Sequence, residues 1–334
     1  MTKCQLMTLT CLFIFVTQFS LSDVIIKDVN AAIHLQNDRY MILYGGEEHQ
    51  ASIYDAVNDE MIRDVVRTGR GPGESESLSA FYHDTDSNTY FFGDEAGQLF
   101  LFNSEFELIE LTRLGNYVMT DIHADSDYIW ISIRAMIAEE TTMTEPHTSV
   151  LKLDRESLTI VDEIIITLKD LALDQVDNID RIRLLYFSAG LKSYNNSLWL
   201  TFDYFPFLFR LDEDGSIGDS YRFTDEQTLE VVQRNGLRGT RTISICTNSQ
   251  LIGSHVYCWK GNAGQDIDYG WYALDLENPS DAATSGAIDD VGGEEGMLRI
   301  IQGETTAAAF IPALFFGEGS SYLLRSERTL VDGD

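Results

Sequence analysis

A strand-and-turn pattern that recurs about every 50 residues limits this chain to a repeat architecture. Each copy is an apolar alternating run that ends in Asp or Asn and is followed by a turn and another strand. The copies end at Asp55, Asn103, Asp154, Asp212, Asp275 and, in a degenerate form, Ser326. An Asp or Asn side chain in this place accepts hydrogen bonds from backbone amides of the turn. Each copy therefore predicts the hairpin that joins the third and fourth strands of a small sheet.

A second apolar run precedes each of the first five copies. These runs are Tyr40–Tyr44, Tyr90–Gly93, Tyr128–Ser132, Leu198–Thr201 and Val256–Trp259. Another strand and a polar turn lie before each run. A lone four-stranded sheet must stack on neighbours to bury both its faces. The pattern therefore predicts an all-β chain, a six-bladed β-propeller with four-stranded antiparallel blades.

One strand is left over before the first unit. It spans Val24–Val29. We predict that this N-terminal strand closes the last blade as its outer strand, so that the two ends of the chain meet. Two helical segments are expected in the longer connections, at Thr167–Val176 and Asp225–Asn235.

The stretch from Gly69 to Glu74, Gly-Arg-Gly-Pro-Gly-Glu, is a tight turn between two β-rich segments. Its glycines allow backbone angles that side chains forbid, and Pro72 fixes one φ. The turn resembles the Gly-x-Gly-Pro-Gly-Glu connection between blades in secreted bacterial six-bladed propellers of the NHL-like and TolB-like kind. The resemblance covers residues 30–332 by repeat pattern and only residues 69–74 by a specific motif. It implies the range of functions of that family: binding proteins, signalling modules, and metal-dependent lactonases and lyases.

Residues 1–22 have the features of a secretory signal. Lys3 supplies a positive start, Leu9–Phe19 is apolar, and the small residues Ser20 and Ser22 precede a cleavage site before Asp23. A membrane anchor is the alternative, but the apolar run is short for a bilayer span. We predict a secreted or periplasmic protein in which residues 23–334 form a single propeller domain, with no transmembrane span after cleavage.

The formal net charge is −31, with six lysines against seventeen arginines. Such a surface repels nucleic acids and anionic membranes, so neither is an expected partner. The charge suits solubility in a salty medium, where self-repulsion is screened, better than it suits a dedicated acidic binding function. Two cysteines outside the signal, Cys246 and Cys258, flank a predicted hairpin. They form either a disulfide, which an exported protein permits, or two buried thiols.

Arginines concentrate in the predicted connections between blades. Eight of the seventeen lie there: Arg67, Arg70, Arg113, Arg181, Arg183, Arg234, Arg238 and Arg241. Converging guanidinium groups bind carboxylates and phosphates. The candidate anion site consists of Arg67, Arg70, Arg181, Arg183, Arg238 and Arg241. The simpler alternative is that these arginines form ion pairs with nearby carboxylates, such as Glu74 and Glu76.

Three histidines, His34, His83 and His123, stand at corresponding places where a first strand meets its turn. They are a candidate metal cluster, since imidazole is a common ligand, or a turn residue repeated by ancestry. Asp-x-Asp pairs nearby comprise Asp84, Asp86, Asp125 and Asp127. They make Ca²⁺ the one candidate cofactor, although turn carboxylates explain them more simply. Trp130, Trp199 and Trp259 share one strand register and are expected to fill space between blades.

No nucleophile elbow, Walker loop or dinucleotide fingerprint is present in the sequence. The leading hypothesis is a non-catalytic module that binds a protein or a small anionic ligand through the face formed by the inter-blade loops. The alternative is a metal-dependent hydrolase or lyase, similar to a lactonase, with its site at the channel mouth.

Overall fold

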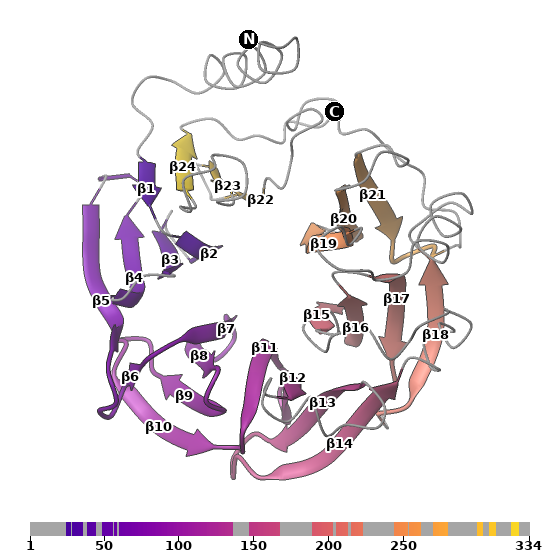
Figure 1. The fold of residues 1–334 in the computed structure, drawn as a ribbon, viewed down its shortest axis with the longest axis horizontal. Coiled ribbons are helices and arrows are strands. Elements are labelled where there is room, and N and C mark those ends of the chain that lie inside the picture. Colours follow the sequence, from indigo (N-terminus) through magenta and orange to yellow (C-terminus); the bar gives the residue numbers. More distant parts are fainter. Residues whose placement is uncertain are drawn as a thin grey trace. The chain divides into compact units, whose positions relative to one another are not determined.

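The computed structural model describes residues 25–27, 29–35, 39–44, 49–55, 57–58, 60–135, 147–167, 189–202, 205–212, 215–222, 244–252, 254–261, 270–279, 299–302, 307–311 and 322–326. Every regular element among them is a β-strand (Figure 1). The two helical segments expected from the sequence lie outside the described residues, except that Thr167 ends a strand. Within the described part there is no helix long and apolar enough to cross a bilayer. The chain divides into two compact units, Met1–Leu78 with Ile288–Asp334, and Ser79–Ala287.

The first unit contains two sheets. One has the order β1-β24-β23-β22, formed by β1 (Ile25–Lys27), β22 (Arg299–Gln302), β23 (Ala307–Ile311) and β24 (Tyr322–Ser326). The other has the order β2-β3-β4-β5-β6, formed by β2 (Val29–His34), β3 (Arg39–Tyr44), β4 (His49–Asp55), β5 (Glu60–Thr68) and β6 (Glu74–Ser75). Strand β1 pairs antiparallel with β24, with Ile25 opposite Leu324. The prediction that the N-terminal strand becomes the outer strand of the last sheet is therefore confirmed.

The second unit contains four sheets that follow one another along the chain (Figure 1). We name them C to F. Sheet C is formed by β7 (Leu78–Asp84), β8 (Thr89–Asp94), β9 (Gln98–Phe102) and β10 (Leu108–Arg113). Sheet D is formed by β11 (Tyr117–Ala124), β12 (Tyr128–Ala135), β13 (His147–Asp154) and β14 (Ile160–Thr167). Sheet E is formed by β15 (Ala189–Tyr194), β16 (Ser197–Phe202), β17 (Phe205–Leu211) and β18 (Ile217–Arg222). Sheet F is formed by β19 (Ser244–Ile252), β20 (His255–Gly261) and β21 (Gly270–Asp275).

Each of these sheets is an antiparallel meander, in which consecutive strands are neighbours. All five predicted second strands and all six predicted third strands are observed as strands. The turn role of the Asp or Asn is confirmed at four positions. Asp55 accepts from the Val57 amide at 2.9 Å, and Asn103, Asp154 and Asp275 make the equivalent bonds. The Asp212 carboxylate accepts from the Arg210 guanidinium at 3.2 Å, and the next two residues of its turn lie outside the described part of the chain.

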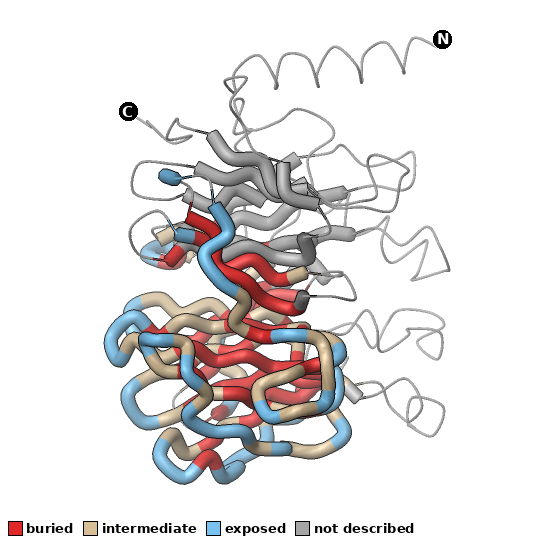
Figure 2. Tube along the Cα trace, turned by 90° about the vertical axis from the view of Figure 1, so that its left-hand side faces the viewer, coloured by how far each residue is buried: buried red, intermediate tan, exposed pale blue. Residues whose placement is uncertain are grey.

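The core of the second unit lies between neighbouring sheets. Phe91 and Leu99 of sheet C pack against Met119, Ile131 and Leu151 of sheet D. Similar clusters join sheet D to sheet E and sheet E to sheet F. In Figure 2 the buried strand residues are red and the exposed turns are pale blue. Burial of each large apolar side chain contributes about 1.5–3 kcal/mol, so the sheets are stabilised chiefly by their neighbours.

Two of the three aligned tryptophans can be placed. Trp130 is 6% exposed and packs in the cluster between sheets D and E. Trp199 is 4% exposed and packs in the cluster between sheets E and F. The expectation that they fill space between successive sheets is confirmed for both residues. The side chain of Trp259 lies outside the described part of the chain.

Candidate functional site

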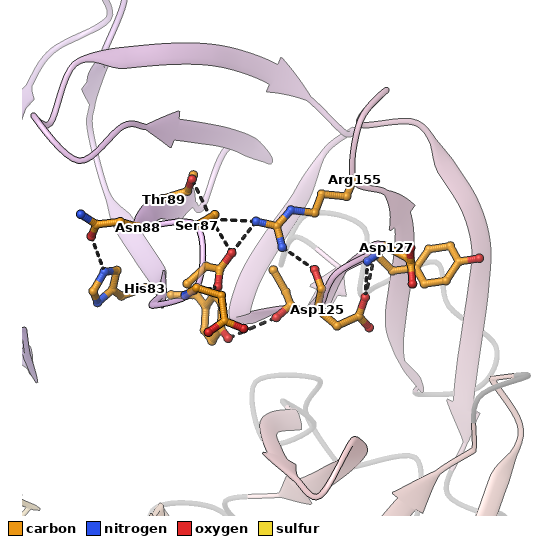
Figure 3. Close-up of polar contacts among 12 residues, drawn as sticks. His83, Ser87, Asn88, Thr89, Asp125, Asp127 and Arg155 are labelled. Carbon is orange, nitrogen blue, oxygen red and sulfur yellow. Dashed lines mark hydrogen bonds and ion pairs between the residues drawn. The ribbon is translucent and has the colours of Figure 1, made fainter.

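Arg155, in the β13–β14 turn, joins three turns of two sheets (Figure 3). Its guanidinium donates to the Asp84 carboxylate and, at 2.9 Å, to the Ser87 hydroxyl, both in the β7–β8 turn. It also donates to the main-chain oxygen of Asp125, in the β11–β12 turn. The Arg155 amide donates to the Asp127 oxygen at 3.0 Å. These turns of sheets C and D therefore lie at one end of the strands, which we call the turn end; the opposite end is the loop end.

The Asp84–Arg155 pair is largely withdrawn from solvent, with side-chain exposures of 8% and 21%. Burial by itself raises the pKa of Asp84. Hydrogen bonds from Ser87 at 2.5 Å, from Arg155 and from the Asp86 amide outweigh burial and hold that pKa below its ordinary value. The carboxylate is thus ionised and already occupied by protein donors. Its evident role is to fasten sheet C to sheet D.

Both carboxylate oxygens of Asp125 also accept hydrogen bonds from the protein. One carboxylate oxygen accepts from the amides of Asp127 at 2.9 Å and Tyr128 at 2.7 Å. The other accepts from the Trp130 indole at 2.8 Å. Turn carboxylates, the simpler interpretation of the Asp-x-Asp pairs, are therefore what the structure shows at Asp84 and Asp125. Among the described residues, no group of three or more His, Cys, Asp or Glu side chains is arranged to hold a metal ion.

The structure places two of the three candidate metal-ligating histidines. His83 stacks on the Tyr90 ring with centroids 4.3 Å apart, and its Nε2 lies 3.0 Å from Asn88 Oδ1. His123 meets the Tyr82 ring edge-on at 4.9 Å. Each ring therefore has its own separate neighbours. His34 ends β2 in the first unit, and its side chain lies outside the described residues.

The glycine-rich turn has a specific internal geometry. After β5 the chain folds back so that β6 pairs parallel with β5, and Gly69 donates to the Ser75 oxygen at 3.2 Å. Glu74 accepts from the Gly71 amide at 2.7 Å, and its carboxylate lies over Gly69, where a Cβ would come within 2.1 Å of it. Gly73 has φ +75°, a conformation that glycine adopts readily. The motif is thus a turn closed by its own glutamate.

Two of the six arginines of the candidate anion site lie here, Arg67 near the end of β5 and Arg70 in the turn that follows. Arg70 donates to Glu76 with nitrogen–oxygen distances of 2.7 and 3.3 Å. Arg67 lies 3.9 Å from the Asp64 carboxylate. Both side chains are mostly exposed, at 84% and 74%. At these two positions the carboxylate-pairing alternative describes the contacts. Arg181, Arg183, Arg238 and Arg241 lie outside the described residues, so their part of the anion site stays a prediction.

The cysteine pair is only partly placed. Cys246 lies in β19 and Cys258 in β20, which are neighbours as predicted. Their register sets Thr247 opposite Trp259 and Gln250 opposite Tyr257, with bulges between these pairs. The two cysteines are not among the directly opposed residues, and their side chains lie outside the described part. A disulfide between them stays a prediction.

Polar contacts on the first strands join sheet D to sheet E. Thr120 donates to the Ala189 oxygen at 3.2 Å, and Asp121 accepts from the Leu191 amide at 2.8 Å. Lys192 Nζ lies 3.6 Å from the Asp121 carboxylate. The bond between Asp121 and Leu191 joins two sheets and links residues that are 70 positions apart in the chain. Asp121 therefore satisfies a strand amide that its own sheet leaves unpaired.

Sheets E and F also bring their turns together. Tyr194, at the end of β15, donates to Glu277 at 2.8 Å. Leu276, just after β21, donates from its amide to the Ser254 oxygen of the β19–β20 turn at 2.8 Å. The turns between consecutive strands of one sheet are short at this end. Four longer connections leave from the other end: residues 136–146, 168–188, 223–243 and 262–269. Residues 276–298, which follow β21, begin at the turn end.

Sequence reasoning did not single out Arg155, Asp121 or Arg134. One sequence feature could have drawn attention to Arg155. It directly follows the Asp that ends its copy of the repeat, and no other copy has an arginine at that position. Arg134 had another, since it is the one charged residue of an otherwise mostly apolar strand. Neither feature shows what surrounds the side chain, because its surroundings include a different sheet.

Comparison with known proteins gives the fold and no more. No protein-family model matches the chain, and no curated protein sequence is similar to it. The solved structure of U3-55K is similar with a TM-score of 0.53 and 7% identity, over 87% of this chain and 78% of that one. A protein of unknown function from Bacteroides caccae has a TM-score of 0.47 and 9% identity, over 81% and 82%. Dihydro-heme d1 dehydrogenase NirN has a TM-score of 0.43 and 11% sequence identity, and the match covers 89% of this chain and 55% of NirN.

The chain thus spans about half the length of NirN. At these identities, similarity concerns fold rather than function. Successive four-stranded antiparallel sheets, packed face to face within a unit, define an all-β fold of the β-propeller-like class. Membership of the NHL-like or TolB-like family stays a prediction.

Proposed function

We propose that this protein is an exported six-bladed β-propeller that acts as a non-catalytic binding module through the loop end of its sheets. The observation that carries the proposal is the difference between the two strand ends in the second unit. In sheets C to E the turn end carries short turns, and Arg155 links those of sheets C and D, whereas the connections 136–146, 168–188 and 223–243 leave from the loop end. Loops on a rigid sheet scaffold are where binding residues concentrate.

The arginines predicted to accept an anion support this choice of end. Arg181 and Arg183 lie in the connection 168–188, and Arg238 and Arg241 lie in 223–243. Both connections join strands at the loop end. The partner is accordingly a protein or a small molecule that presents carboxylate or phosphate groups. The metal-dependent alternative lacks a comparable basis, because the described residues offer no cluster of metal-ligating side chains on which to argue it.

The test is to replace residues 168–188 or 223–243 by a short glycine–serine linker. Calorimetry then measures the binding of phosphate, sulfate, succinate and citrate. Loss of binding in either variant is expected. The matched control is Asn196→Gly at the turn end, which keeps the turn because Asn196 already has φ +59°. Anion binding that survives both replacements contradicts the proposal. Stoichiometric calcium or zinc in the purified protein would instead favour the metal-dependent hydrolase or lyase.

A further inference from the structure

Arg134 has a buried guanidinium nitrogen with no partner. Among the described residues, three side-chain polar atoms are buried without a hydrogen bond: Ser79 Oγ, Trp199 Nε1 and Arg134 Nη1. The first two belong to neutral groups. Arg134 is charged, and its side chain as a whole is only half-buried, although Nη1 is buried. A buried charged donor without an acceptor is more costly than a neutral one, so an anion is the natural partner of Nη1.

The position of Arg134 places that missing anion at the loop end. Arg134 is the penultimate residue of β12, which ends at Ala135. Alternate residues of a strand share a face, so Arg134 lies on the same face as Ser132 and Trp130. Trp130 packs with Ala189 at the start of β15. Arg134 therefore lies on the side of sheet D that faces sheet E, near the point where the chain enters β15.

The hydroxyls beside Arg134 are already engaged within the protein. The Thr120 hydroxyl lies 3.2 Å from the Ala189 oxygen and 2.9 Å from the hydroxyl of the fully buried Ser132, and it has one proton to share between them. Thr148, fully buried in the neighbouring strand, donates to the Ile133 oxygen at 2.9 Å. The guanidinium of Arg134 is therefore the donor on which an anion at this position depends.

We propose that Arg134 is the charge anchor of a binding site for a small carboxylate or phosphate anion, at the loop end of the seam between sheets D and E. This inference rests on the proposed function and adds the ligand class and the first residue that holds it. The planar guanidinium binds such groups with two parallel hydrogen bonds. A protein of formal charge −31 gains little from long-range attraction, so affinity must come from these close contacts.

The test compares wild type, Arg134→Met and Arg134→Lys. Calorimetry with inorganic phosphate and with succinate distinguishes the two sources of the anion. Binding of at least one anion is expected in wild type. It should weaken at least about tenfold in Arg134→Met and less in Arg134→Lys. Arg113→Met is the matched control: this exposed arginine ends β10 at the loop end, donates to Asn116 at 3.0 Å, and should bind as wild type does.

Thermal unfolding without ligand separates a ligand anchor from a structural residue. If Arg134 lacks an acceptor in the free protein, Arg134→Met unfolds at an equal or higher temperature, because an uncompensated charge is removed. A fall of several degrees with unchanged anion affinity shows an internal carboxylate partner and overturns the inference. Failure of wild type to bind either anion overturns it as well.

The inference and the proposed function fail in different ways. If linker replacement of residues 168–188 and 223–243 abolishes anion binding while Arg134→Met retains it, the loop end binds but Arg134 is not the anchor. If both linker variants retain binding that still depends on Arg134, the site stands and the role of the long connections is wrong.

Discussion

Asp84 and Arg155 form an ion pair across two sheets, although 71 residues separate them in the chain. Asp84 ends the first strand of sheet C, and Arg155 follows the third strand of sheet D. Ser87 and the main-chain oxygen of Asp125 take up further donors of the same guanidinium. One side chain thus fixes how two sheets meet at their turn end.

Replacing Arg155 by methionine is expected to destabilise the protein by about 3 kcal/mol. The change leaves the Asp84 carboxylate, 8% exposed, without its counter-charge, and an uncompensated buried charge carries a cost of that order. Urea unfolding measures the loss. Asp127→Ala is the control, since Asp127 is exposed and its carboxylate accepts from the exposed Ser126 hydroxyl. Equal stabilities of the two variants would contradict the role assigned to Arg155.

Stability is expected to decline as pH falls below about 6.5, in part because of His123. Burial lowers the pKa of His123 and outweighs the opposing attraction of Asp125, Asp121 and Asp84. A lowered folded-state pKa means that the contribution to stability is complete above the unfolded value of about 6.5. It is lost as pH falls from there through the folded-state value. Urea unfolding of His123→Phe should therefore show a smaller decline between pH 8 and pH 5.5 than wild type.

The comparison at pH 8 isolates the packing change, because His123 is neutral there in both folded and unfolded chains. A variant whose stability declines with pH as steeply as that of wild type would show that His123 does not contribute. Direct titration of the His123 ring by NMR gives an independent measure of the same shift.

Gly73→Ala is expected to destabilise the first unit by about 1 kcal/mol. Gly73 has φ +75°, where an alanine Cβ clashes with the backbone. Gly73→Asn should cost less, because asparagine tolerates this region better than other residues with a side chain. Thermal unfolding of the two variants shows which of them is less stable. If alanine and asparagine are equally tolerated, the turn has relaxed and the positive φ is not what requires glycine.

Asp121→Ala is expected to cost about 1–3 kcal/mol, the range for leaving a buried donor unsatisfied. The lost partner is the Leu191 amide, which bonds to Asp121 at 2.8 Å. Asp121→Asn keeps an acceptor for that amide and loses only the attraction to Lys192, so it should cost less. Chemical denaturation of both variants separates the two contributions. If Asp121→Asn loses more stability than Asp121→Ala, the hydrogen bond from the Leu191 amide is not the main contribution of Asp121.

The strands and their turns follow from local chemistry, which is why they were predictable. An alternating run such as Val150–Asp154 has one face to bury, and its terminal Asp reaches an amide three residues on. Even the pairing of β1 with β24 follows, since a leftover apolar strand needs a sheet with an open edge.

Contacts between sheets depend on which turns the folded chain brings together, and no local pattern encodes that. The amino-acid order alone assigned Asp84 and Asp125 to turns, yet it did not distinguish Arg155 from the other sixteen arginines. Packing of sheet D against its neighbours turned Arg155 into a clamp and buried a nitrogen of Arg134 without an acceptor. Strand formation is decided within a few residues, whereas the environment of a charge is decided by chain segments that lie far away along the sequence.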